Sequence, residues 1–157
     1  MEISKVLYNA WLIAYKDIFR KEFLEELEEN RWVPFLIDMF DKNSGSILVA
    51  ENEGEIIGVS LFGSTRDGIK GHGEVYSFYV IPEYWRKSFG RQLMEGTLES
   101  LKENYEIADV WVLEENERAI GFYEALGFIK CGQEKNIVED EILLPHILLT
   151  QKFKEAN

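Results

Sequence analysis

The chain has 157 residues, of which 46% are apolar and 13% aromatic, and this size and composition fit one globular domain over residues 1–157. Its formal net charge of −12 argues against non-specific nucleic-acid binding, because such binding depends on Lys and Arg side chains that neutralise phosphates. No stretch approaches the roughly 18 consecutive apolar residues of a membrane helix, and Cys131 is the single cysteine, so we expect a cytoplasmic protein without membrane contact or an internal disulfide.

The first forty residues have apolar side chains at helical spacing and predict three helices, over residues 2–19, 21–30 and 31–40. Trp11 and Tyr15 lie four positions apart on the apolar face of the first helix, so packing in the core is the simpler interpretation of both. The glutamates between Glu22 and Glu29 predict a solvated helix face. If they border a site, they favour a cationic ligand.

Near residue 46 the apolar period changes from helical to strand-like. Strands are predicted over residues 46–51 and 55–63, joined by a hairpin turn at Asn52-Glu53-Gly54. A glycine-containing loop, 67–73, leads to a strand over 74–81. The remaining predicted elements are a helix over 89–104, a strand over 108–113, a helix over 116–126, a strand over 128–133, a polar loop and a strand over 142–152. This order predicts an α/β fold whose mixed sheet is covered by helices on both faces.

The segment from Tyr79 to Met94 predicts an anion site, because an aromatic strand runs through a short basic turn into a helix. A helix start leaves several backbone N–H groups without intrahelical partners and carries about half a positive charge. Arg86, Lys87 and Arg91 add side-chain charge around the same turn, against the acidic balance of the whole chain.

This turn resembles the pyrophosphate loop of the GNAT superfamily of acyl-CoA-dependent N-acetyltransferases, with the consensus Arg/Gln-x-x-Gly-x-Gly/Ala. The matching positions run from Trp85 to Gly90. Trp85 stands where Arg or Gln is usual, and Ser88 stands where the first glycine is usual. Serine presents a backbone N–H as glycine does, but it is costlier if the loop needs a positive φ.

A second segment, Trp111 to Phe128, is similar to the other signature of the family, in which a strand and an Asn precede a helix that ends in Phe-Tyr-Glu-x-x-Gly-Phe. Asn116 and Tyr123 lie seven positions apart and share one face of this helix. The resemblance implies that Tyr123 donates a proton to the departing CoA thiolate and that Asn116 contacts pantetheine or a water. The alternatives are that Asn116 caps the helix and that Tyr123 is a packed aromatic side chain.

The resemblance also assigns roles to the strand before the loop. Glu74 stands where many relatives have a glutamate that deprotonates the amine, often through water; the alternative is a carboxylate that caps a strand edge in solvent. Backbone groups from Phe78 to Val80 are expected to face the acetyl carbonyl and to pair with pantetheine amides. The residues expected to bind the cofactor are Phe78, Tyr79, Val80, Arg86, Lys87, Ser88, Phe89, Gly90, Arg91, Asn116 and Tyr123.

The resemblance implies a mixed, mostly antiparallel GNAT fold that transfers the acetyl group of acetyl-CoA to a primary amine by direct attack in a ternary complex. A strand normally precedes the first helix of this fold, so that strand is absent or the native start lies upstream. We expect a small-molecule or peptide amine as acceptor, a cationic one if the glutamates border the site, and no metal, because His72 and His146 have no partners at ligand spacing. The alternative is a catalytically impaired acyl-CoA-binding or interaction module, and the sequence leaves open whether the chain forms a homodimer.

Overall fold

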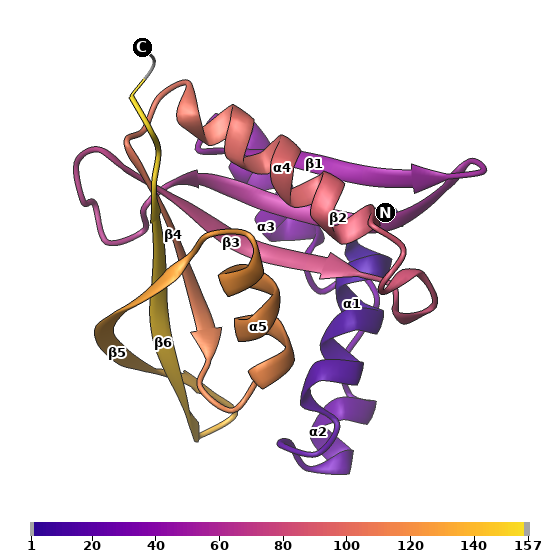
Figure 1. The fold of residues 1–157 in the computed structure, drawn as a ribbon. Coiled ribbons are helices and arrows are strands. Elements are labelled where there is room, and N and C mark those ends of the chain that lie inside the picture. Colours follow the sequence, from indigo (N-terminus) through magenta and orange to yellow (C-terminus); the bar gives the residue numbers. More distant parts are fainter. Residues whose placement is uncertain (1, 156–157) are drawn as a thin grey trace. The chain divides into compact units, whose positions relative to one another are not determined.

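The computed structural model describes residues 2–155, in which three helices precede the first strand (Figure 1). The helices are α1 (Glu2–Tyr15), α2 (Lys21–Glu25), α3 (Val33–Asp41), the short 3-10 helix η1 (Pro82–Tyr84), α4 (Phe89–Lys102) and α5 (Glu117–Ala125). The strands are β1 (Gly45–Asn52), β2 (Glu55–Ser64), β3 (His72–Val80), β4 (Ile107–Leu113), β5 (Ile129–Glu139) and β6 (Ile142–Lys152). Within residues 2–155, no helix is both long and apolar enough to cross a membrane.

The six strands form an open mixed sheet in the order β1-β2-β3-β4-β6-β5. β3 runs parallel to β4, whereas β6 is antiparallel to both of its neighbours. A parallel pair needs a crossover connection, and α4 lies in the connection between β3 and β4. The predicted α/β class and mixed sheet are therefore confirmed. Within the described residues, the first strand begins at Gly45, after the three N-terminal helices.

The chain divides into two compact units. The first consists of Met1–Leu61 and Ser77–Thr97, and the second of Phe62–Tyr76 and Leu98–Asn157. The expected single domain over residues 1–157 stays a prediction.

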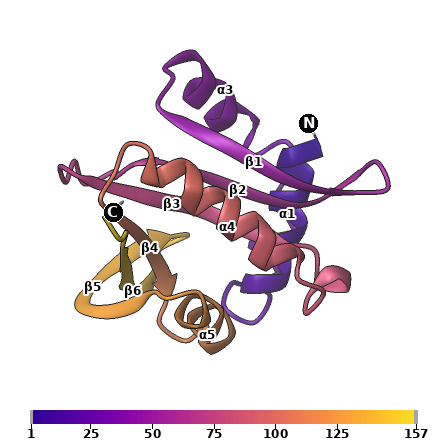
Figure 2. The ribbon, with the colours of Figure 1, turned by 45° about the horizontal axis from the view of Figure 1, so that its top comes forward.

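In the first unit, α3 lies along β1 (Figure 2), and the beginning of α4 packs on β2. The fully buried Thr97 hydroxyl bonds both to the Ser60 hydroxyl, at 2.8 Å, and to the Leu93 carbonyl, at 2.9 Å. Gly58 permits this close approach, because a Cβ at that position would lie 3.2 Å from both the Leu93 side chain and the Tyr79 carbonyl.

In the second unit, β4, β6 and β5 lie side by side with α5 next to them (Figure 1). β4 pairs with β6 from Ile107 opposite Lys152 to Leu113 opposite His146. β5 follows β6 with a register shift between Lys130 and Glu134. The apolar core of this unit includes the buried side chains of Val75, Leu101, Ala108, Val110, Val112, Phe128 and Leu149.

Two predicted helices end earlier than expected. The first ends at Tyr15 instead of Phe19, and the second at Glu25 instead of Asn30. A buried contact within the first unit explains the second difference: the Ser4 hydroxyl donates to the Glu29 carbonyl at 2.6 Å and accepts from the Trp32 N–H at 3.3 Å. These backbone groups are satisfied by a side chain from α1, so the chain leaves the helix without losing hydrogen bonds.

The predicted polar loop after residue 133 is wrong, because β5 continues to Glu139. A tight turn at Asp140 and Glu141 connects it to β6, and both residues have positive φ, 47° and 62°. Positive φ at two consecutive residues is typical of a two-residue hairpin turn. This turn joins the polar strand β5 directly to the apolar strand β6.

Candidate functional site

The loop between β3 and α4 lies in the first unit and has an unusual backbone. After η1, both Arg86 and Ser88 have positive φ, 59° and 65°, and α4 begins at Phe89. The Ser88 carbonyl accepts the first helical hydrogen bond, from the Gln92 N–H at 3.0 Å, and the Ser88 hydroxyl accepts from the Gln92 side chain at 3.2 Å. The positive φ that makes serine costlier than glycine is therefore present at Ser88.

Backbone donors and positive side chains meet in this loop. From Ser88 to Arg91, no backbone N–H donates a hydrogen bond to another backbone group within the described part of the chain. Arg86 and Lys87 are exposed; the Lys87 ammonium lies 5.5 Å from the centre of the Tyr84 ring, and Arg91 forms an exposed ion pair with Glu95. Since a helix start favours anions, this arrangement suits a phosphate group.

Trp85, which replaces the usual Arg or Gln, links the loop to the end of β3. Its indole N–H donates to the Val80 carbonyl at 2.7 Å, and its side chain is half-buried. One backbone acceptor of the stretch from Phe78 to Val80, which we expected to pair with pantetheine, therefore already has a protein donor. The role expected for this stretch stays a prediction.

Asn116 and Tyr123 lie in the second unit, before and within α5. The Asn116 side-chain oxygen accepts a hydrogen bond from the Ala119 N–H at 3.1 Å, which is the helix-capping contact expected as the alternative. Tyr123 is buried, with the Phe122 and Phe128 ring centres 5.4 and 5.6 Å from its own. Burial raises the pKa of the Tyr123 phenol, so this side chain remains protonated at neutral pH.

Glu74 is buried in β3 of the second unit with 1% of its surface exposed, so the alternative of a strand-edge carboxylate in solvent is wrong. Its Oε2 accepts a hydrogen bond from the backbone N–H of Arg66 at 2.9 Å, and its Oε1 accepts from Nε and Nη2 of the same residue at 3.0 and 2.5 Å. Sequence reasoning missed Arg66, because nothing in the local pattern links this loop residue to a strand position eight residues later.

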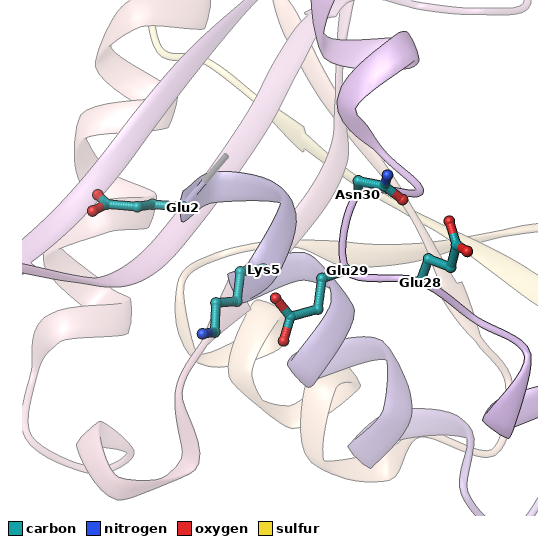
Figure 3. A pocket seen from close by; sticks show the side chains of 5 residues that line it. All are labelled: Glu2, Lys5, Glu28, Glu29 and Asn30. Carbon is teal, nitrogen blue, oxygen red and sulfur yellow. The ribbon is translucent and has the colours of Figure 1, made fainter.

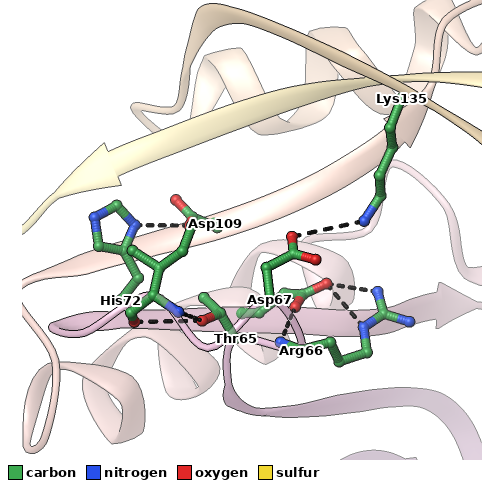
Figure 4. A network of polar contacts seen from close by, with 8 residues as sticks. Thr65, Arg66, Asp67, His72, Asp109 and Lys135 are labelled. Carbon is green, nitrogen blue, oxygen red and sulfur yellow. Dashed lines mark hydrogen bonds and ion pairs between the residues drawn. The ribbon is translucent and has the colours of Figure 1, made fainter.

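A wider polar network surrounds this pair (Figure 4). His72 Nδ1 donates to Oδ2 of the buried Asp109 at 2.7 Å, and the Lys135 ammonium lies 3.9 Å from Asp67. Burial raises the pKa of the Asp109 carboxyl, while the hydrogen bond from His72 opposes that shift. Because β3 begins at His72 rather than at Glu74, alternation along the strand gives His72 and Glu74 the same face, a signal that the predicted strand boundary concealed.

The N-terminal helices form an aromatic cluster and an open cavity within the first unit. The Trp11 ring stacks on Phe19 with centres 5.0 Å apart and lies 4.3 Å from the Tyr15 ring centre, so both residues pack against aromatic neighbours, although both are half-buried rather than in the core as expected. The cavity has a volume of about 480 Å³ (Figure 3). It is lined by Glu2, Lys5, Glu28, Glu29 and Asn30. Among residues 2–155, no group of three or more His, Cys, Asp or Glu side chains is arranged to hold a metal ion.

A comparison with known protein families covers both the loop before α4 and the helix α5. A model of the Acetyltransferase (GNAT) family matches residues 7–128, which include the loop before α4 and the whole of α5. The chain belongs to this family, as its two motifs predicted.

Two curated proteins and one solved structure illustrate the relationship. An uncharacterised N-acetyltransferase of Archaeoglobus fulgidus is 33% identical over 89 residues, so the match spans 54% of this chain and 60% of that relative. An N-alpha-acetyltransferase of Sulfurisphaera tokodaii is 28% identical over 112 residues, 65% of this chain and 67% of the relative. The PaiA N-acetyltransferase of Thermoplasma acidophilum, solved in complex with coenzyme A, has the same fold, with a TM-score of 0.71 at 17% identity over 97% of this chain and 91% of that chain.

Proposed function

We propose that this chain is an acetyl-CoA-dependent N-acetyltransferase, that residues 1–157 act as one domain, and that the acetyl group passes directly to a primary amine in a ternary complex. The observation that carries the proposal is the row of backbone N–H groups from Ser88 to Arg91, which have no backbone acceptor within residues 2–155 and lie at the start of a long helix. In a chain of the GNAT family, these donors suit the pyrophosphate of acetyl-CoA. The bound coenzyme A of the Thermoplasma structure supports the choice of cofactor.

Both backbone and side-chain groups of the loop between β3 and α4 contribute to binding the pyrophosphate. The N–H groups of Ser88, Phe89 and Gly90 bind the phosphates, while the side chains of Arg86, Lys87 and Arg91 add positive charge. Backbone groups of Phe78, Tyr79 and Val80 pair with pantetheine, and an N–H of this stretch meets the charge that develops on the acetyl carbonyl oxygen.

Tyr123 acts as the general acid. The amine nitrogen attacks the thioester carbon, the C–S bond then breaks, and the thiolate takes the phenol proton. The phenol carries its proton at neutral pH, as a general acid must, and the burial that raises the pKa of Tyr123 would equally disfavour a charged thiolate beside it, so that proton transfer to sulfur is not opposed. The side-chain NH₂ of Asn116, whose oxygen caps α5, contacts pantetheine or a bound water.

Glu74 acts as the base that removes a proton from the amine, directly or through a water. Its burial supports a contact with the amine, because a carboxylate shielded from bulk water attracts an ammonium group more strongly and places an acceptor oxygen next to the proton that must leave. Three hydrogen bonds from Arg66 leave one of the about four acceptor positions of the carboxylate for that proton.

The acceptor is a small-molecule or peptide amine. The name of the Sulfurisphaera relative, an N-alpha-acetyltransferase, supports a peptide α-amino group. The three carboxylates along the cavity between α1 and the segment before α3 support a cationic one. The single free cysteine fits the reducing cytoplasm, and a homodimer remains a further proposal that sedimentation would test.

The test combines ligand binding with turnover. Acetyl-CoA at about 100 times its Kd stabilises the native state by roughly 2.7 kcal/mol, which raises the melting temperature by roughly 5 to 10 °C for a chain of this length. Release of CoA thiol on a panel of amines and peptides establishes transfer. Stabilisation without release on any acceptor would favour the alternative, an acyl-CoA-binding module, and no stabilisation would defeat both.

Tyr123→Phe tests the general acid. We expect kcat to fall by about a hundredfold or more, with the Kd of acetyl-CoA unchanged within about twofold, because only the proton-donating hydroxyl is removed and the ring stays. Tyr105→Phe, a matched loss of one phenol in the same unit, should leave both constants unchanged. Equal kcat values for the two variants would show that Tyr123 is only a packed aromatic side chain.

A further inference from the structure

One residue, Arg66, holds the buried carboxylate of Glu74 through three hydrogen bonds. Nε and Nη2 of the guanidinium both donate to Oε1, and the backbone N–H of Arg66 donates to Oε2 at 2.9 Å. A carboxylate oxygen accepts about two hydrogen bonds. Oε1 is therefore saturated, while Oε2 keeps one acceptor position.

The charge of Arg66 is also needed, because a buried carboxylate requires an opposite charge or strong hydrogen bonds. Glu74 has 1% of its surface exposed, and the charged group bonded to it is the Arg66 guanidinium. Two further titratable groups that interact with Glu74, Asp109 from β4 and Tyr76 from β3 itself, carry no positive charge. His72 is directed to Asp109, not to Glu74.

Arg66 is itself held in position by Tyr76 of β3 and by its own loop between β2 and β3. Its guanidinium carbon lies 5.3 Å from the centre of the Tyr76 ring, and the Tyr76 hydroxyl donates to the Ser64 carbonyl. The turn that follows is closed by the Thr65 hydroxyl, which accepts from the Ile69 N–H at 2.8 Å. The backbone that carries the Arg66 guanidinium is therefore fixed by hydrogen bonds on both sides of the residue.

We propose that Arg66 is a positioning residue for acetyl transfer, which holds the Glu74 carboxylate through Oε1 and leaves Oε2 as the oxygen that accepts the proton of the amine. The N–H electron pair then stays on nitrogen and forms the bond to the acetyl carbon. This inference rests on the proposed function, in which Glu74 is the base. It adds that Oε1 takes no part in proton transfer and that Arg66 affects the rate through Glu74 alone.

The test is a double-mutant cycle on kcat, with release of CoA thiol as the readout. Arg66→Gln lowers kcat by about ten- to a hundredfold, as expected for a displaced catalytic group, while KM for acetyl-CoA changes by less than about twofold. Arg66→Lys has a higher kcat than Arg66→Gln but a lower one than the wild type, because lysine keeps the positive charge but cannot form both guanidinium hydrogen bonds to Oε1. In a Glu74→Gln background, Arg66→Gln changes kcat by less than about twofold, because the group that it positions is already disabled.

Controls separate this inference from the proposed function. Lys42→Gln removes an equal charge from an exposed ion pair with Asp38 and should leave kcat unchanged. Losses that multiply in the double variant, or a loss confined to KM, would overturn the role of Arg66 alone. Wild-type kcat in Glu74→Gln would overturn the base, and an inactive wild-type chain would overturn acetyl transfer itself. If Arg66→Gln does not fold, Arg66→Lys decides: a several-fold lower kcat that vanishes in the Glu74→Gln background supports the inference, and an unchanged kcat contradicts it.

Discussion

Replacing Ser88 with glycine tests the backbone of the loop that we propose binds pyrophosphate. Ser88 has a φ of 65°, a left-handed conformation that costs a non-glycine residue roughly 1–2 kcal/mol. Glycine adopts it without that penalty. Lys87, the preceding residue, is a matched control, because it is also exposed and has no positive φ.

The expected magnitude follows from three contributions. Relief of the left-handed conformation favours Ser88→Gly by roughly 1–2 kcal/mol, and the greater freedom of glycine in the unfolded chain opposes it by roughly 0.5–1 kcal/mol. The lost hydrogen bond from the Gln92 side chain, which is exposed, opposes it by about 0.5 kcal/mol. Ser88→Gly should therefore be close to neutral, whereas Lys87→Gly, which has no strain to relieve, should destabilise by about 0.5–1 kcal/mol.

Urea denaturation of both variants without ligand measures the difference, and a thermal scan should show it as a gap of about 1–4 °C between their melting temperatures. Arg86→Gly, at a φ of 59°, should behave like Ser88→Gly in stability but should bind acetyl-CoA more weakly, because it removes a positive charge. Equal destabilisation by Ser88→Gly and Lys87→Gly would refute the left-handed backbone at Ser88.

Two further predictions concern buried polar groups. Burial lowers the pKa of the His146 imidazole, although its hydrogen bond to the Leu144 carbonyl acts in the opposite direction. As pH falls, the unfolded chain therefore binds the proton first, and the free energy of unfolding decreases below about pH 6.5. His146→Gln should flatten this pH dependence in urea titrations at pH 7.5 and 5.5, and a dependence identical to that of the wild type would contradict the prediction. Thr97 bonds to Ser60 and to a carbonyl, so Ser60 must be the donor of their shared bond, and Thr97→Val should cost about 1–3 kcal/mol by leaving the Ser60 hydroxyl buried without a partner. Adding Ser60→Ala should recover part of that loss, and a double variant less stable than Thr97→Val would argue against the shared bond.

The two hairpins show what a single sequence can predict about the fold. The turn at Glu53 and Gly54 and the turn at Asp140 and Glu141 both have two consecutive residues with positive φ. The first contains a glycine and was predicted, whereas the second has two acidic residues that give no such signal. Its conformation depends on the pairing of β5 with β6, and that long-range contact leaves no local pattern.

The candidate site shows the same limit. The motif residues from Arg86 to Arg91 are contiguous, so the loop and the following helix could be predicted from their order alone. The surroundings of Glu74 could not, because its burial and its bonds to Arg66 depend on the loop between β2 and β3 folding back on the strand. The left-handed backbone at Ser88 was predictable only in part. The family consensus showed that glycine is usual at this position, and the positive φ of Ser88 in the structure gives the physical reason.

The pairing of Arg66 with Glu74 constrains the order in which relatives can lose the two residues. Loss of Arg66 first would leave a carboxylate with 1% exposure without its counter-charge, a change that typically costs about 3–5 kcal/mol, a large share of the stability of a domain. Loss of Glu74 first would leave a guanidinium whose side chain is 53% exposed and can turn to water. Descendants that keep the arginine without the glutamate should therefore be common, and those that keep the glutamate without a cation at the arginine position should be rare.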